Sequence, residues 1–269
     1  YNSSFKDIDE NTINIEIYRD SGGTLIASEL LCSADAVSIN YESDDDVFKP
    51  IKCSDCQINV LTTKVLANLY TALGNQIYCT ISKNGSLLWC GYSVPCLYST
   101  DYNEEYNLLS LQFNDILSSL NNYNYTYLNE KQSIVSFYQV IKHIISQIDS
   151  NGLIKNVYVH NAKKITDLLN NLFILDRNFF DEANEAENCK DVLEYIARYL
   201  GMTCYYYGDS IYFVDYDIIK NINLYTKYTL SDDSNTVVAL DNTVINVNQN
   251  IYESNASIAI GELYNKVVV

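Results

Sequence analysis

Apolar side chains recur at every second position through much of the first 121 residues, and this spacing constrains the fold more than any other feature of the chain. In residues 12–18, for example, Ile13, Ile15 and Ile17 alternate with less apolar neighbours. A period of two is that of a β-strand with one buried face. With 269 residues and 48% hydrophobic content, the chain is long enough to bury such strands in a core.

The strongest local signal is a hairpin centred on Asn84 and Gly85. Alternating apolar runs at 76–82 and 87–92 flank this pair. Both central residues tolerate the positive φ that a two-residue type I′ turn requires, so the sequence predicts two antiparallel strands here. Residues 64–73 place apolar side chains on one helical face ahead of a glycine, which predicts a short helix.

A polar stretch at 121–129 precedes a change of period. Beyond it, apolar residues recur every three to four positions at 132–148 and at 188–200, which predicts two amphipathic helices. Asn188 is the expected N-cap of the second helix, and Gly201 is its expected C-terminal cap. Strands are predicted at 203–207, 210–214, 236–240 and 243–247.

These patterns predict an α+β fold with predominantly antiparallel β-structure in two modules. Residues 1–121 form a β-rich, barrel-like module with one short helix. Residues 122–269 form an α+β module, which we expect to continue beyond residue 269. The sequence contains no apolar run long enough to span a bilayer and no signal-peptide pattern.

The chain is strongly acidic, with 34 Asp and Glu residues against 17 Lys and Arg and a formal net charge of −17. Proteins that grip nucleic acid use basic side chains to displace counterions from phosphates, so this charge argues against a DNA-binding role. An acidic surface suits a wall past which DNA slides without adhering, because like charges repel. It also suits an ordinary soluble protein.

Cysteines offer one weak candidate site. Cys53 and Cys56 form a Cys-x-x-Cys pair, but a structural zinc site needs a second pair at a defined spacing. A thioredoxin-type motif opens a helix, whereas this pair leads into a predicted strand. Core positions are expected for the free thiols of Cys79, Cys90, Cys189 and Cys204.

Other catalytic motifs are missing from the sequence. His143 and His160 belong to no zinc-protease motif, and the chain has no serine nucleophile elbow and no phosphate-binding glycine loop. The acidic pairs at 104–105 and 181–182 and the acidic run at 185–187 fit solvated surface positions better than a glycosidase pair. We therefore expect no enzyme, no cofactor and no metal.

One stretch of the first module resembles a known family. It reads Ile81-Ser-Lys-Asn-Gly85-Ser-Leu-Leu-Trp89-Cys-Gly91-Tyr-Ser-Val-Pro95-Cys-Leu-Tyr98. It is similar to the strand pair "hydrophobic–Lys-x-Gly-x-hydrophobic–Trp-x-Gly", followed by a proline and an aromatic edge, of tail hub proteins in phages and prophages of gut Bacteroidetes, crAss-like phages among them. The strand and turn at 106–120 also resemble an element of that family.

The second module resembles the same family. The helix at 192–200, Gly201 and the hairpin ending at Val214 are similar to the helix–Gly–strand–Gly–strand element of baseplate hub domains. Residues 264–269 resemble the strand that opens the next module of such proteins. The cysteines depart from the family pattern.

The resemblance implies tail-tube-like β-barrel modules with helical insertions, assembled as a trimeric or hexameric ring around the DNA channel. Such a subunit joins the tail tube to fibre, spike or baseplate proteins in the virion tail, after assembly in the host cytoplasm, and DNA passes it transiently. The family offers no catalytic residues. Structural roles are expected for Trp89, Gly85, Gly91, Pro95 and Gly201.

Two other functions remain open on the sequence. The first is a secreted or surface β-rich binding module for a glycan or a protein, which the missing signal peptide and the thiol-like cysteines count against. The second is an enzyme domain of a tail that hydrolyses peptidoglycan or another glycan, which the lack of any catalytic motif counts against.

Overall fold

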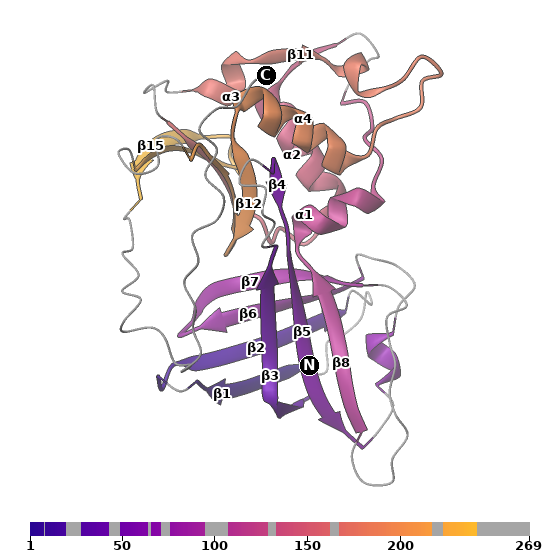
Figure 1. Cartoon of the computed structure of the whole chain (residues 1–269), viewed down its shortest axis with the longest axis vertical. Helices are drawn as coiled ribbons and strands as arrows, with labels where there is room; N and C mark the ends of the chain where they lie inside the picture. The colour runs from indigo at the N-terminus through magenta and orange to yellow at the C-terminus, as the bar shows by residue number, and fades with distance from the viewer. Residues whose placement is uncertain are drawn as a thin grey trace, which may run out of the picture. The chain divides into compact units, whose positions relative to one another are not determined.

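In the computed structural model, the labelled strands and helices of Figure 1 all lie within Tyr1–Ala239. Pro95, Tyr98 and the predicted strand at 243–247 lie outside the described residues. The residues that the structure describes are 1–7, 9–19, 28–42, 49–63, 66–70, 76–94, 107–128, 133–161, 167–216 and 223–240.

Seven strands form a nearly closed, barrel-like sheet in the order β1–β2–β6–β7–β8–β5–β3, with all neighbours antiparallel. The end strands meet where Asn2 bridges Glu29, and the Asn2 carbonyl accepts a 2.8 Å hydrogen bond from the Leu30 amide. The strands are β1 (Asn2–Lys6), β2 (Thr12–Arg19), β3 (Leu31–Tyr41), β5 (Ser54–Thr62), β6 (Ile77–Lys83), β7 (Ser86–Ser93) and β8 (Asn107–Asn114).

The predicted alternation of apolar and polar residues corresponds to side chains that point into and out of this sheet. Ile15, Ile58 and Phe113 belong to one buried cluster inside it, while the residues between them along each strand face outward. The hairpin between β6 and β7 is confirmed: Asn84 has φ 51° and Gly85 has φ 82°, as a type I′ turn requires.

A second sheet has six strands in the order β15–β14–β10–β13–β12–β4. It is mixed, because β10 runs parallel to β13 and β12 runs parallel to β4, while the other pairs are antiparallel. The α+β class with predominantly antiparallel β-structure is confirmed, although the sequence analysis predicted neither parallel pair. The strands are β4 (Ile51–Lys52), β10 (Asn156–His160), β12 (Thr203–Tyr207), β13 (Ser210–Val214), β14 (Leu224–Thr229) and β15 (Asn235–Ala239).

Two amphipathic helices, α2 (Phe137–Ile148) and α4 (Cys189–Leu200), pack on one face of this sheet (Figure 1). The predicted caps of α4 are confirmed: the Asn188 side chain accepts a hydrogen bond from the Asp191 amide, and Gly201 has φ 66°. Among the described residues, no helix combines the length and the apolar content needed to cross a bilayer.

The prediction for 132–148 placed the start of its helix too early. Residues Ile134–Ser136 instead form strand β9, which pairs with β11 (Phe173–Leu175), and Ser136 then caps α2 through a capping box with Gln139. Strand pairing overrides helical periodicity here because the β9 backbone finds its partner outside the segment.

The predicted helix at 64–73 is also wrong in its described part, which forms a single 3₁₀ turn, η1 (Ala67–Leu69). The remaining described turns are short: α1 (Ile116–Ser119), η2 (Leu120–Asn122), α3 (Leu168–Asn171) and η3 (Asp176–Phe179).

The core consists of two buried clusters. One lies inside the seven-stranded sheet, and the other, the shared core, joins Tyr92 and Leu117 to residues of α2, α4 and the second sheet, such as Ile51, Ile141 and Phe213. The division at residue 121 therefore stays a prediction, because strand β4 of the first segment pairs with β12 of the second.

Replacing Gly91 by alanine is expected to destabilise the fold by about 3 kcal/mol, because the added Cβ overpacks a filled site. It would lie 2.3 Å from the Asn114 carbonyl oxygen and 2.4 Å from the Trp89 ring. Urea denaturation measures the loss. Gly85→Ala is the control: its Cβ meets nothing within 4 Å and costs only the strain of φ 82°, about 1 kcal/mol. A larger loss for Gly85→Ala would contradict this account.

Candidate functional site

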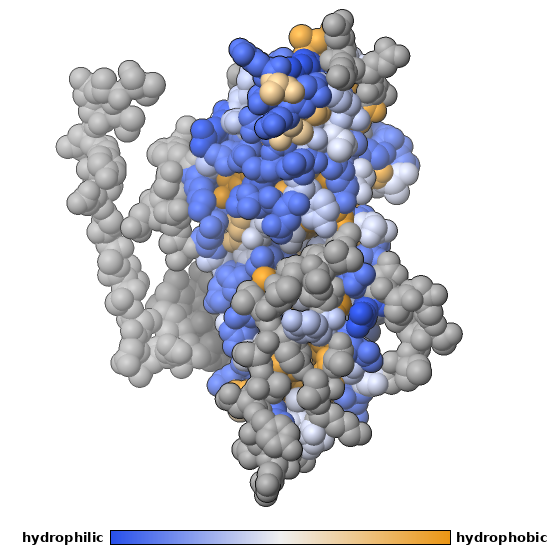
Figure 2. All heavy atoms as spheres, turned by 90° about the vertical axis from the view of Figure 1, so that its right-hand side faces the viewer, coloured by the Kyte–Doolittle hydropathy of each residue, from blue (hydrophilic) through white to orange (hydrophobic). Residues whose placement is uncertain are grey.

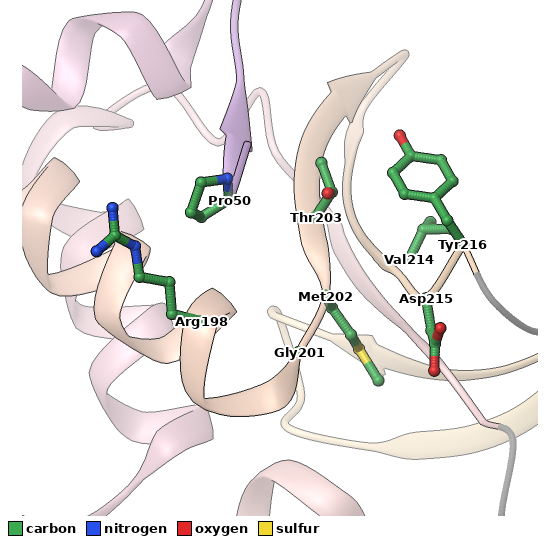
Figure 3. A pocket seen from close by; sticks show the side chains of 8 residues that line it. All are labelled: Pro50, Arg198, Gly201, Met202, Thr203, Val214, Asp215 and Tyr216. Carbon is green, nitrogen blue, oxygen red and sulfur yellow. The ribbon is translucent and has the colours of Figure 1, made fainter. Parts of the chain in front are cut away.

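One surface pocket of about 220 Å³ lies beside the C-terminal end of α4 (Figure 3). Arg198 and Asp215 lie on opposite sides of it, and Figure 3 shows their charged ends pointing apart. Catalysis needs groups that converge on one reacting atom, and these two do not. The pocket is lined by Pro50, Arg198, Gly201, Met202, Thr203, Val214, Asp215 and Tyr216.

Cys53 and Cys56 do not form a joint site. Cys53 belongs to the core shared by the two sheets, whereas Cys56 belongs to the interior of the seven-stranded sheet. Burial raises the pKa of each thiol to about 12, so both stay protonated at neutral pH and are poor metal ligands. Within the described residues, no three His, Cys, Asp or Glu side chains gather closely enough to hold a metal ion.

The other singled-out thiols occupy core positions, as predicted: Cys79, Cys90, Cys189 and Cys204 are all buried. Burial raises the pKa of Cys90 to about 12 and that of Cys189 to about 11. A protonated thiol is a weak nucleophile, so none of these positions suits a catalytic cysteine.

The two histidines lie in different surroundings. His143 contacts Thr126, whose hydroxyl oxygen is 2.9 Å from its Nε2, and its ring stands edge-on to Tyr125. His160 is buried and stacks on Tyr225 with ring centroids 4.8 Å apart. Of the acidic stretches, 104–105 lies outside the described residues, and Asp181, Glu182 and Glu185 are exposed.

A buried polar cluster, missed by the sequence analysis, lies at the boundary between β4 and β5. The Asp115 carboxylate accepts hydrogen bonds from the Ser54 amide (2.6 Å), the Ser54 hydroxyl (2.8 Å) and the Ser118 amide (2.7 Å). The Ser54 hydroxyl in turn accepts a 2.9 Å bond from the Trp89 indole. The cluster thus ties β5, β7 and the start of α1 together.

A second contact crosses between the sheets next to this cluster. The Cys90 sulfur lies 2.7 Å from the Tyr206 hydroxyl, which also donates to the Gly208 carbonyl. Two residues further along β7, the Tyr92 hydroxyl donates to Asp149. Consecutive residues of β7 therefore serve two cores: Trp89 lies in the barrel-like sheet, and Cys90 lies in the shared core.

A row of side chains crosses the six-stranded sheet on the face away from α2 and α4. Strand register places Tyr158, Tyr212 and Tyr205 side by side, with Lys227 at one end and Lys52 at the other. The rings of Tyr158 and Tyr212 are stacked at 4.8 Å, and those of Tyr205 and Tyr212 at 5.2 Å. Because these rings stack on one another, the ring faces between them are not free to receive a sugar ring.

The terminal strands of the two large sheets differ in how they are protected from pairing with another chain. β3 carries a register shift between Cys32 and Val37, and β4 has only two residues and follows Pro50. Both are devices that discourage edge pairing. β15 has no charge, no proline and no register shift, and Val237 is 45% exposed.

Four of the five residues with an expected structural role lie within the described part of the chain. Trp89 is buried, Gly85 forms the hairpin turn, Gly91 touches β8 and the Trp89 ring, and Gly201 caps α4. Pro95 lies outside the described residues. The sequence does not predict the Asp115 cluster or the tyrosine row, because the residues of each are far apart in the chain and meet only in the folded sheets.

No protein-family model matches this sequence, and no curated protein matches it. Among solved structures, the chain is similar to a 43 kDa tail protein of prophage MuSo2 from Shewanella oneidensis, with 16% identity and a TM-score of 0.38, over 60% of this chain and 46% of that one. It is also similar to a tail protein from Neisseria meningitidis MC58, with 17% identity and a TM-score of 0.39, over 68% of this chain and 51% of that one. The chain thus spans about half the length of each structure.

Replacing Asp115 by asparagine is expected to change how stability depends on pH. Burial raises the pKa of this carboxyl from 3.8 to about 6. Between these two values the folded carboxyl holds a proton that the unfolded one has lost, so the stability of the native protein falls as pH rises from about 4 to 6. Asparagine cannot titrate, so the variant gains on the native protein by up to about 3 kcal/mol across this window.

Urea unfolding at pH 4, 5, 6 and 7 measures this difference in free energy. The variant loses one acceptor for the Ser54 amide at every pH, which lowers its stability by a constant amount. Glu182→Gln, at an exposed position, controls for general effects of pH. A constant gap between native protein and Asp115→Asn would show that this carboxyl does not titrate in that range.

Proposed function

We propose that this chain is a structural subunit of a bacteriophage tail, in the hub or baseplate, and that it has no enzymatic role. In this proposal, copies form a trimeric or hexameric ring around the DNA channel and join the tail tube to fibre, spike or baseplate proteins. The virion tail is its final location, after assembly in the host cytoplasm.

The observation that carries the proposal is a nearly closed, seven-stranded sheet joined through a shared core to a second sheet. This architecture agrees with the β-barrel module and helical additions that the sequence resemblance implies. A ring subunit has to transmit force without hinging, and a shared core supplies that rigidity.

Two further features support assembly with other chains. Among the described residues, β15 pairs only with β14, carries no charge or proline and leaves Val237 45% exposed, as an edge strand that pairs with another chain would. The net charge of −17 suits the lining of a channel, because an acidic wall repels DNA and lets it pass.

The protonation and the placement of the reactive side chains among the described residues support a non-enzymatic role. The core thiols are protonated, the two charged groups of the pocket point apart, and the acidic groups at 181–185 lie at the surface. Trp89, Gly85, Gly91 and Gly201 then act through packing and turn geometry, and we extend the same proposal to Pro95.

The purified chain is expected to form rings of three-fold or six-fold symmetry with a central hole, measured by light scattering and by electron-microscopy class averages. Raising the salt from 0.05 to 0.3 M is expected to favour the rings, because salt screens the repulsion between subunits of charge −17. A strict monomer at high concentration in both salts would contradict the proposal. A glycan screen would then test the chain as a surface binding module.

A further inference from the structure

The sequence contains two Asn-Gly pairs, Asn84–Gly85 and Asn151–Gly152, and each lies in a turn. Asparagine is thermolabile, and it is most labile before glycine, because the glycine amide nitrogen can attack the asparagine side-chain carbonyl. Glycine has no Cβ to shield this nitrogen. The attack requires the backbone to rotate, so its rate depends on how firmly each turn is held. The two pairs share this chemistry and differ in their surroundings.

The first pair is held through both its side chain and its backbone. The Asn84 side-chain oxygen accepts a 2.9 Å hydrogen bond from the Thr12 amide, and the side-chain nitrogen donates to Asn11 Oδ1 at 2.8 Å. The Asn84 backbone amide donates to the Thr12 carbonyl at 2.8 Å. Lys83 and Ser86 pair across the hairpin on either side of the turn. Attack at Asn84 therefore has to break several contacts first.

The second pair lies in the turn that follows α2, and both of its residues are exposed. The Gly152 amide, which is the attacking group, donates to the Asp149 carbonyl at 3.4 Å. This distance is longer than the usual range for a backbone hydrogen bond. The Asn151 side chain lies near the Tyr92 hydroxyl. The attacking nitrogen is thus weakly held, whereas Asn84 takes part in three bonds of 2.9 Å or less.

The turn can open without loss of the structure around it. The Asp149 carboxylate accepts hydrogen bonds from the amides of Leu153 at 2.9 Å and Ile154 at 2.7 Å, which fix the chain directly after the turn. A Cβ at Gly152 would meet nothing within 4 Å, so the space around this residue is open. Opening an exposed turn of this kind costs far less free energy than global unfolding.

We propose that Asn151 is a site of spontaneous deamidation in the folded protein and that Asn84 is protected. The Gly152 amide nitrogen attacks the side-chain carbonyl carbon of Asn151, and a carbon–nitrogen bond forms. The side-chain nitrogen leaves as ammonia and takes the proton that the Gly152 nitrogen loses. Water then opens the cyclic imide at either carbonyl, which gives aspartate or isoaspartate. The site is independent of the proposed role in a tail.

The product carries one more negative charge at an exposed position. Asp149, whose carboxylate also accepts a hydrogen bond from the Tyr92 hydroxyl, lies two residues before this charge. Figure 2 shows that the described surface is mostly hydrophilic on one face of the protein, and charged groups are ordinary on such a surface. The converted chain is therefore expected to stay folded and to be more acidic than the native chain of charge −17.

Ageing the full chain at mildly alkaline pH tests the site, with peptide mapping by mass spectrometry and anion-exchange chromatography as readouts. In the folded chain, aspartate and isoaspartate are expected to form at 151 at least about tenfold faster than at 84, and a more acidic species appears on the exchanger. In urea both pairs are expected to react at similar rates, because the hairpin no longer protects Asn84.

Gly152→Ala is the matched variant, because its Cβ shields the attacking nitrogen and costs only the strain of φ 65°. Conversion at 151 is expected to fall at least about tenfold in this variant, while conversion at 84 is unchanged. Circular dichroism checks its fold, and the comparison of folded and urea-unfolded native chain stands without it. Conversion at 84 as fast as at 151 in the folded chain overturns the proposal. So does a folded chain that keeps Asn151 intact while the unfolded chain loses it.

Discussion

A buried carboxylate fixes the chain close to the point where it passes from the second sheet into the seven-stranded sheet. Asp115 is almost completely buried, and its carboxylate accepts two hydrogen bonds from Ser54 and one from the start of α1. Burying a charged group costs free energy, which is why burial raises the pKa of this carboxyl to about 6. The hydrogen bonds offset part of that cost. They also fix the chain at Ser54, directly after the strand β4 that joins the second sheet.

This anchor explains why the two sheets share one core. With Ser54 held, β4 pairs with β12 on one side of the boundary, and β5 enters the seven-stranded sheet on the other. β7 reinforces the connection, since Trp89 packs inside that sheet while Cys90 contacts Tyr206. The buried contact between Cys90 and Tyr206 and the shared core therefore both connect the two sheets, and buried hydrogen bonds are costly to leave unmade.

The described surface contains a row of stacked tyrosines and an uncharged strand at the end of the second sheet. The described residues bring no set of reactive groups together, and the tyrosine row across the second sheet stacks upon itself. Among the described residues, β15 pairs only with β14 and carries no charge, on a protein whose net charge is −17.

The sequence by itself determined the features that depend on neighbouring residues. The Asn84–Gly85 turn, the Asn188 and Gly201 caps of α4, and the strand alternation around Ile15 follow from backbone and periodicity preferences that act over a few positions. Only the tertiary structure decided the rest. The Thr203 hydroxyl bonds the Lys49 carbonyl 154 positions away, and the parallel pairs, the Asp115 cluster and the β9–β11 sheet also join residues that are distant in sequence. Such contacts depend on how whole elements pack, because a strand edge or a buried carboxylate accepts whichever partner the packed core brings to it.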